Sequence, residues 1–331
     1  MRRLLGAVAV IGLTLGVPQG AAMAQQAAST CDRQCLAGML DVYMKALIAD
    51  KPEQAPLVYG FRQTENAVVK ALGDGLWKDA TGIGEVDRRY YDPVTGNASW
   101  FGVLQLGSEK TVSAVRLRVQ EGRITEAEWH ITRASDLGIS PQDNDAMFDI
   151  DKFIARQPPT GKMNPSGRQL TRDELIAVTE TYFDGITAHD AAPILAHPGC
   201  TRFENGLEVT GRPQTQSKPH EGHEGKGDCR SGQGNFNVVF VSGRRYPVVD
   251  VEAQAVLAIA TFIREPGHIK RRNHLMEYFY MDDGKIRDVY TAFIYPENTL
   301  PVPNWPPYEG NFPLAGGIAQ PAAQPAAQGA Q

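Results

Sequence analysis

A glutamate in residues 274–280, HLMEYFY, is the residue of this chain best suited to carry chemistry. The stretch has the alternation of a β-strand, and the neighbours of Glu277 are aromatic or aliphatic. A carboxylate in such surroundings is costly to bury unless it has a partner or its pKa is raised. A raised carboxyl pKa suits general acid–base catalysis near neutral pH. Glu277 is therefore the first candidate for a proton-transfer group, and a buried ion pair without chemistry is the alternative.

The elements that would position Glu277 occur twice, because the sequence contains two related halves. With Leu36 set against Leu175, the matches in order are Tyr43 with Tyr182, Glu65-Asn66 with Glu204-Asn205, Arg88-Arg89-Tyr90 with Arg244-Arg245-Tyr246, and Gly122-Arg123-Ile124 with Gly284-Lys285-Ile286. Each match is weak alone, and their shared order indicates a duplication. Residues 157–168 are rich in Pro and Gly, which predicts a linker between domains at 31–156 and 169–298.

Each half has a helical pattern followed by strand patterns. The first helix has apolar residues at i, i+3 and i+4 spacing, and the second opens with Thr171 and Glu174 in a capping-box pattern. Four longer strands are expected from Val86, Asn97, Thr111 and Arg123, and again from Arg244, Gln254, Arg271 and Lys285. The predicted fold class is α+β, with two tandem cone-shaped domains in which N-terminal helices pack on a curved antiparallel sheet.

Within this pattern, the motifs CDRQCL, FRQTEN, GDGLWKDATG, RFENG and RRYPVVD resemble those of an uncharacterised tandem-domain family of secreted fungal and bacterial proteins. That family is similar to the nuclear transport factor 2-like superfamily, which includes the SnoaL-like proteins. The resemblance spans nearly all of Cys31 to about Pro296. It implies a cone fold that is found in isomerases, dehydratases, epoxide hydrolases, polyketide cyclases, lyases and non-catalytic binders. The fold alone does not choose a reaction.

The last hairpin of each half can be compared face by face. In the second half, Glu277 takes the inward position of Val115, and Thr291 takes that of Trp129. The second cone is therefore predicted to be more open and more polar than the first. Its expected substrate-binding residues are Arg202, Arg244, Thr291, Phe279 and Phe293, and either arginine could pair with Glu277.

Three further residues are candidates to assist Glu277. Asp250 aligns with Val94 and is, like Glu277, new to the second half. Tyr246 has a counterpart in Tyr90, so core packing is its default role. Glu204 is expected at the mouth of the cone. The predicted catalytic set is thus Glu277, Asp250, Tyr246 and Glu204.

The outward face of the second hairpin carries His274, Met276, Tyr278 and Tyr280, which is unusually apolar for a solvated strand. The resemblance implies that this sheet face makes a dimer. In the first half, the corresponding face carries a ladder of Arg116, Arg118, Glu126 and Glu128, which we expect to be solvated. The two copies could pack sheet to sheet within one chain, but these two faces match poorly, so another chain, as in a homodimer, is the favoured partner, with His274 as an interface residue.

The ends of the chain and its cysteines indicate export. Residues 1–24 have the basic start, apolar run and Ala-Met-Ala end of a cleaved signal peptide, which predicts a periplasmic or secreted protein with no membrane attachment after processing. An exported protein can form disulfides. Cys200 and Cys229 flank a Gly-rich loop and could pair; Cys31 and Cys35 could form a strained bridge, and other pairings remain open. Residues 299–314 should wrap onto the domains, and 315–331 should be a disordered tail.

Composition and motifs narrow the function further. There are 33 Lys and Arg against 38 Asp and Glu and no basic stripe, which argues against nucleic-acid binding. No phosphate loop, dinucleotide fingerprint or nucleophile elbow occurs, so no cofactor is expected. The segment KPHEGHEGK at 218–226 favours a solvated loop over a metal site, and we predict no metal. The expected function is a cofactor-independent lyase, dehydratase or isomerase activity on a small hydrophobic or aromatic compound. The alternative is a non-catalytic ligand- or protein-binding module.

Overall fold

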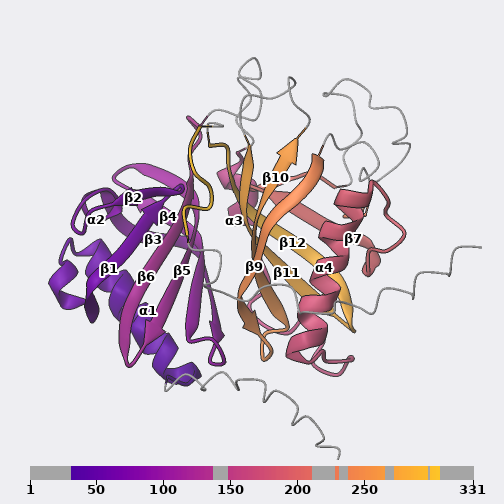
Figure 1. Cartoon of the computed structure of the whole chain (residues 1–331), viewed down its shortest axis with the longest axis horizontal. Helices are drawn as coiled ribbons and strands as arrows, with labels where there is room; N and C mark the ends of the chain where they lie inside the picture. Colours follow the sequence, from indigo (N-terminus) through magenta and orange to yellow (C-terminus); the bar gives the residue numbers. More distant parts are fainter. Residues whose placement is uncertain are drawn as a thin grey trace, which may run out of the picture.

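The computed structural model describes residues 31–136, 148–210, 228–230, 238–264, 272–296 and 299–305. The predicted signal segment 1–24, the segment 218–226 and the tail 315–331 lie outside these residues. Figure 1 shows two α+β units side by side, each with a sheet and a long helix. The predicted α+β class with two tandem domains is confirmed.

The two domains have the same element order. The first contains α1 (Arg33–Ile48), the 3₁₀ helix η1 (Pro52–Gln54), β1 (Leu57–Glu65), β2 (Val68–Lys70), α2 (Leu76–Asp79), β3 (Ala80–Asp92), β4 (Asn97–Leu106), β5 (Glu109–Gln120) and β6 (Arg123–Thr132). After α3 (Ile150–Ala155), the second contains α4 (Arg172–Ala188), β7 (Ala196–Glu204), β8 (Leu207–Glu208), β9 (Val238–Asp250), β10 (Ala255–Arg264), β11 (Asn273–Asp282) and β12 (Lys285–Ile294).

Each sheet has six strands, in the orders β2-β1-β6-β5-β4-β3 and β8-β7-β12-β11-β10-β9. The predicted antiparallel sheet needs one correction, because β1 pairs with β6, and β7 with β12, in parallel. These parallel pairs place Glu65 beside Trp129 in the first sheet and Glu204 beside Thr291 in the second. The glutamates of the repeated Glu-Asn motif therefore adjoin the same strand position in both domains.

The helices form where the sequence predicts them. In α1, Leu36, Leu40, Tyr43 and Leu47 are fully buried, as their spacing requires, and the Asp32 side chain accepts the Cys35 backbone N–H at the start of the helix. The α4 helix begins with the predicted capping box between Thr171 and Glu174. The apolar faces of α1 and α4 pack on their own sheets, within two separate hydrophobic clusters.

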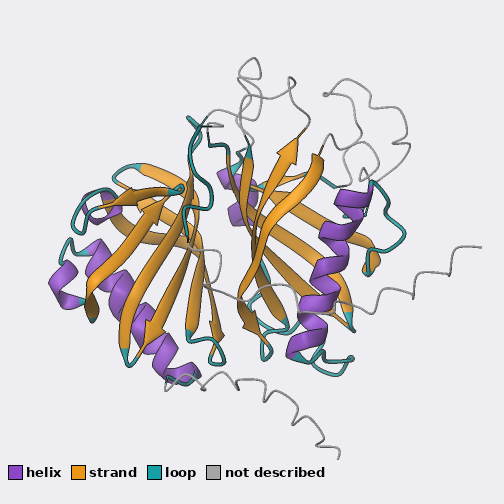
Figure 2. Ribbon diagram, viewed as in Figure 1, coloured by secondary structure: helices purple, strands orange, loops and turns teal. Residues whose placement is uncertain are grey.

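A third hydrophobic cluster joins the two sheets face to face (Figures 1 and 2), so the layers run helix, sheet, sheet, helix. The Phe101 and Tyr278 rings stack across this interface with centroids 4.6 Å apart. The hydroxyls of Tyr90 and Tyr280 lie 2.5 Å apart. The apolar face that was expected to bind a second chain is thus covered by the first domain of the same chain.

Three members of the ladder, Arg116, Glu126 and Glu128, are buried in this interface, and the Arg118 side chain is 25 % exposed. Arg116 lies opposite Glu128, as the register predicts, but both side chains are no more than 4 % exposed. The expectation of a solvated ladder is therefore wrong. Arg245 of the second domain donates to both Glu128 carboxylate oxygens, at 3.1 and 2.6 Å. This contact was not predicted from the sequence. Through it, an arginine on the otherwise apolar face of the second sheet pairs with a glutamate on the charged face of the first.

Two further ion pairs link the domains with approximate two-fold symmetry. Asp92 accepts from Arg172 at the start of α4 and from the Val249 backbone N–H. Asp250 accepts from Arg33 at the start of α1 and from the Tyr91 backbone N–H. Both aspartates are fully buried. Because each pair joins one sheet to the opposite helix, the domains hold each other in a fixed arrangement.

The segment 299–305 packs on the first domain. The Trp305 indole donates to the Thr64 hydroxyl at 3.0 Å, and the Arg62 guanidinium lies 4.3 Å from the centre of the Trp305 ring. Trp305 is only 7 % exposed. The described part of the predicted wrap therefore links the end of the second domain to β1. No helix among the described residues is long and apolar enough to cross a membrane.

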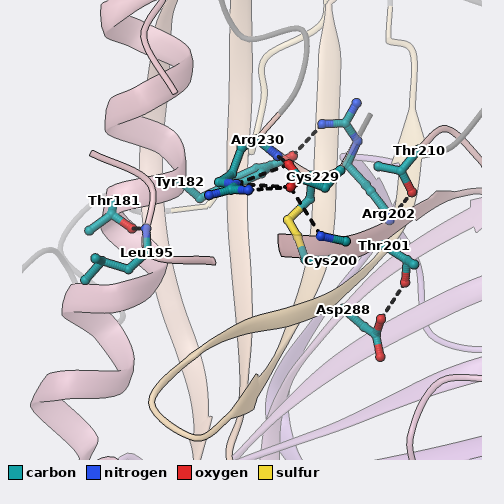
Figure 3. Close-up of a disulfide and its surroundings, with 12 residues drawn as sticks. Thr181, Tyr182, Leu195, Cys200, Thr201, Arg202, Thr210, Cys229, Arg230 and Asp288 are labelled. Atoms are coloured by element: carbon teal, nitrogen blue, oxygen red, sulfur yellow. Dashed lines mark hydrogen bonds and ion pairs between the residues drawn. A yellow bond between two sulfur atoms is a disulfide. The ribbon is translucent and has the colours of Figure 1, made fainter. Parts of the chain in front are cut away.

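Two disulfides are present, Cys31–Cys35 and Cys200–Cys229. The first lies at the start of α1. The second joins β7 to residues 228–230, beside Arg202 (Figure 3). Both pairings that the sequence suggested therefore form.

Candidate functional site

Glu277 lies in the middle of β11, with Ala258 of β10 on one side and Thr291 of β12 on the other. Its side chain is 1 % exposed. The Thr291 hydroxyl donates to Glu277 Oε1 at 2.9 Å, and Glu277 Oε2 has no hydrogen-bond partner among the described residues. A buried carboxyl oxygen without a partner is uncommon in a folded protein and needs an explanation.

The same row in the first domain is filled by aromatic side chains. Val115 occupies the position of Glu277, and its cross-strand neighbours are Trp100 and Trp129. Both indoles are fully buried, with ring centroids 6.0 Å apart. In the second domain, Ala258 and Thr291 take the positions of these two tryptophans. Two large rings are thus replaced by a methyl and a small polar group beside a carboxyl.

A hydrogen-bonded network completes the centre of the first domain. The Trp77 indole donates to Gln63 Oε1 at 2.9 Å, the Trp129 indole donates to the Tyr43 hydroxyl at 3.0 Å, and Tyr43 donates to Gln63. Each of these side chains is at most 1 % exposed. Every indole N–H named here has a partner, so this centre is packed and satisfied.

The second domain replaces part of this network with charge. Arg202 and Glu204 occupy the positions of Gln63 and Glu65, and Tyr182 of α4 that of Tyr43. Arg202 donates to the Tyr182 hydroxyl at 3.0 Å, and its Nε lies 3.1 Å from Glu204 Oε1. Figure 3 shows Arg202 and Tyr182 beside the Cys200–Cys229 bond. The structure therefore brings together Arg202, Glu204, Thr291 and Glu277.

Burial dominates the electrostatics of this group. Loss of water raises the pKa of Glu277 from 4.5 to about 8, although the Thr291 hydrogen bond and the positive charge of Arg202 lower it. The negative charge of Glu204 raises this pKa further. At neutral pH, Glu277 is therefore mostly a carboxylic acid. Because Oε1 accepts from Thr291, Oε2 is the oxygen available to donate a proton.

Aromatic side chains share the inner face of the sheet with Glu277. Phe279 lies two residues along β11 and meets Tyr182 edge-on, with centroids 5.2 Å apart. Phe293 and Tyr295 stack with centroids 6.3 Å apart. The Tyr295 hydroxyl is buried and has no hydrogen-bond partner among the described residues. Tyr295 was not among the predicted site residues, although its period-two spacing from Thr291 and Phe293 indicates the same face.

Tyr246 and Arg244 lie elsewhere in the second domain. Arg244 forms ion pairs with Glu180 and Asp184 of α4, both at 2.6 Å. Tyr246 donates to the same Glu180. Their described contacts therefore fix β9 to α4, and Arg202 is the arginine whose charge acts on Glu277.

Asp250 likewise does not join Glu277, because its carboxylate bonds to Arg33 and to the Tyr91 backbone. The alignment of Asp250 with Val94 is wrong. Asp250 pairs with Ala255 at the end of β9, just as Asp92 pairs with Asn97 at the end of β3. Asp250 thus has a first-half counterpart that makes an equivalent interdomain contact.

Comparisons with known proteins give one family match and one solved structure to report. A family described as "Domain of unknown function (DUF8021)" matches residues 168–293, which is the second domain. No curated protein has a significantly similar sequence. A solved structure of an NTF2-like protein of unknown function from Cytophaga hutchinsonii matches with 8 % identity and a TM-score of 0.25, over 29 % of this chain and 89 % of that chain.

Proposed function

We propose that the second domain binds a small hydrophobic or aromatic molecule against Glu277. The single observation that supports this proposal is the substitution of the Trp100–Val115–Trp129 row by Ala258–Glu277–Thr291. A core needs close packing and satisfied polar atoms, and this row loses two indoles while it gains an unpartnered carboxyl oxygen. A ligand with an apolar ring and one polar group would restore close packing and give the carboxyl oxygen a hydrogen-bond partner.

We further propose that Glu277 transfers a proton in a cofactor-independent lyase, dehydratase or isomerase reaction. In an elimination, the Glu277 carboxylate removes a proton from carbon while the C–O bond breaks, and the same proton then passes to the departing oxygen. The products are an alkene and water or an alcohol. In an isomerisation, the proton returns to a different carbon. A carboxyl with a pKa of about 8 can act in both directions near neutral pH.

Arg202 and Glu204 would tune this group rather than touch the proton. The Arg202 guanidinium favours the ionised form of Glu277, and thus stabilises the carboxylate when its proton has left. Glu204 partly offsets that charge through its ion pair with Arg202. Phe279, Phe293 and Tyr295 would hold the apolar body of the ligand. The four Cys residues joined in two disulfides support our proposal of an exported protein.

The first test separates binding from turnover. Small aromatic, terpenoid and polyketide-like compounds are screened against the full chain by thermal shift, and each hit is then incubated with protein and followed by mass spectrometry. Glu277→Gln keeps the shape of the side chain and removes its titrating proton. We expect it to retain binding of the hits within a few-fold and to lose turnover. The matched control is Glu85→Gln on an exposed carboxylate, which should change neither.

The second test changes the residue beside Glu277 on β10. Ala258→Trp restores one first-domain indole to the row and should abolish binding of every hit. Turnover that persists in Glu277→Gln would exclude the proposed chemistry. Binding without any turnover would support the alternative of a non-catalytic ligand-binding module. Binding that persists in Ala258→Trp would exclude this site for either function.

A further inference from the structure

Two histidines from different domains meet between the sheets. His130 lies on β6 and His274 on β11, and their ring centroids are 4.7 Å apart. Both side chains are at most 1 % exposed. Nothing in the proposed function uses them, because they lie on the interface side of the two sheets and Glu277 points to the other side of β11.

The hydrogen bonds of these rings define which nitrogen is available. His130 Nδ1 lies 3.2 Å from the Ala292 carbonyl oxygen, and His274 Nδ1 lies 3.0 Å from the Ala260 carbonyl oxygen. A carbonyl oxygen only accepts, so both Nδ1 atoms carry the hydrogen, and the Thr261 hydroxyl, 2.9 Å from His274 Nδ1, accepts from the same N–H. The Nε2 atoms are then lone-pair acceptors. Both are buried and have no hydrogen-bond partner among the described residues, a state that costs free energy.

Glu128 is the third member of this cluster. One ligand atom from each of Glu128, His130 and His274 lies within 4.8 Å of the others. Metal-bound histidines commonly donate one ring N–H to a carbonyl and coordinate through the other nitrogen, as the rings are arranged here. We propose that Glu128, His130 and His274 form a site for Zn²⁺ that links the two domains.

The chemistry of the three ligands favours this ion. Two imidazoles and one carboxylate oxygen suit Zn²⁺, which takes nitrogen and oxygen ligands at about 2.0–2.2 Å. The atoms must move together modestly to reach that distance. Both Glu128 oxygens already accept from arginines, Oε1 from Arg245 and Oε2 from Arg245 and Arg116, so the metal would take the second lone pair of Oε1. Arg116 also pairs with Glu126.

No spacing in the sequence indicates this site, and no metal was predicted, because the ligands come from two domains and from faces assigned to an ion ladder and to a dimer. The histidines at 220 and 223, outside the described residues, provide a matched control. The full chain is stripped with a chelator, dialysed against buffered Zn²⁺ alone, and its metal content is measured. We expect one equivalent per chain in the wild type and in His220→Gln/His223→Gln, and a raised Tm on Zn²⁺ addition.

Two variants test the ligands directly. His130→Phe and His274→Phe keep a ring in each position, and each should lose the bound equivalent and the Zn²⁺-dependent rise in Tm. Bound Co²⁺ should give visible d–d absorption in the wild type and not in either variant. Glu277→Gln should bind Zn²⁺ normally, so this test is independent of the proposed function. The proposal fails if the His220→Gln/His223→Gln protein binds no zinc. It also fails if both Phe variants fold and still bind one equivalent, because a buried water between the rings would then be the better account.

Discussion

The raised pKa of Glu277 makes a quantitative prediction about stability. Between pH 4.5 and about pH 8, the unfolded chain has released the Glu277 proton while the folded protein retains it. Unfolding therefore releases a proton over this range, so the free energy of unfolding falls as the pH rises. Above about pH 8, both states are ionised and this contribution levels off. Stability from Glu277 is thus present at low pH and lost as the pH passes through the folded-state pKa.

The size of the effect follows from the pKa shift. A change from 4.5 to about 8 corresponds to roughly 5 kcal/mol between the two protonation states. The interval from pH 5 to pH 8 covers most of the range between the unfolded-state and folded-state pKa values. Over this interval, Glu277 should therefore lower the free energy of unfolding by about 3–4 kcal/mol. The maximal slope is about 1.4 kcal/mol per pH unit, the value for one proton.

The perturbation is Glu277→Gln, which is neutral at every pH. Urea unfolding of the wild type and the variant is measured at pH 5, 6, 7 and 8 by circular dichroism and by tryptophan fluorescence, and two-state analysis is applied only where both probes coincide. Other titrating groups are common to both proteins and cancel in the difference. We expect the wild type to lose stability relative to the variant as the pH rises. Glu85→Gln, a control on an exposed carboxylate, should show the wild-type slope.

One outcome would refute the reasoning. If the wild type and Glu277→Gln show the same pH dependence from pH 5 to pH 8, Glu277 is ionised throughout, and Arg202 or water compensates its charge. Thr291→Val gives an independent check, because it removes the hydroxyl whose hydrogen bond lowers the pKa of Glu277. The Glu277 carboxyl carbon, followed by ¹³C NMR, should then titrate at a higher pH than in the wild type.

Two further predictions concern the contacts between parts of the chain. Arg245→Met leaves Glu128 without its interdomain partner and should lower the free energy of unfolding by about 3 kcal/mol in urea, whereas Lys110→Ala, in an exposed pair, should change it by less than about 1 kcal/mol. Trp305→Ala removes a buried indole and its bond to Thr64, and the same assay should show a loss of about 3 kcal/mol; an unchanged urea midpoint would mean that residues 299–305 do not stabilise the first domain.

The features that follow from local periodicity could be predicted from the sequence. The helix stripe from Leu36, the capping box at Thr171 and the opposition of Glu277 and Thr291 each depend on spacing within one element or one tight hairpin. The replacement of Trp129 by Thr291 was visible for the same reason. The replacement of Trp100 by Ala258 was not predicted, because it depends on how β4 and β10 are aligned with the last hairpin of each domain.

The predictions that were wrong concern features that depend on irregular strands or on contacts between residues distant in the sequence. Residues 245 and 248 of β9 face β10 positions only two residues apart, so β9 contains one extra residue. This residue accounts for one of the two positions by which the count missed Asp92, and the other arises because Arg88 corresponds to Arg245 rather than to Arg244. No spacing rule could show that Arg245 would reach Glu128 across the interface. The buried ladder and the covered sheet face are two consequences of that one packing event.

The duplication accounts for how the second domain could tolerate a buried acid. A penalty of roughly 5 kcal/mol at high pH is comparable with the whole net stability of a typical domain. The second domain does not stand alone, since its outer face lies in a hydrophobic cluster shared with the first domain, and Asp250 and Arg245 bind across that interface. The first domain keeps its row of tryptophans and a fully bonded centre. A rigid, well-packed copy fused to a second copy would therefore leave that second copy free to exchange core packing for a buried carboxyl.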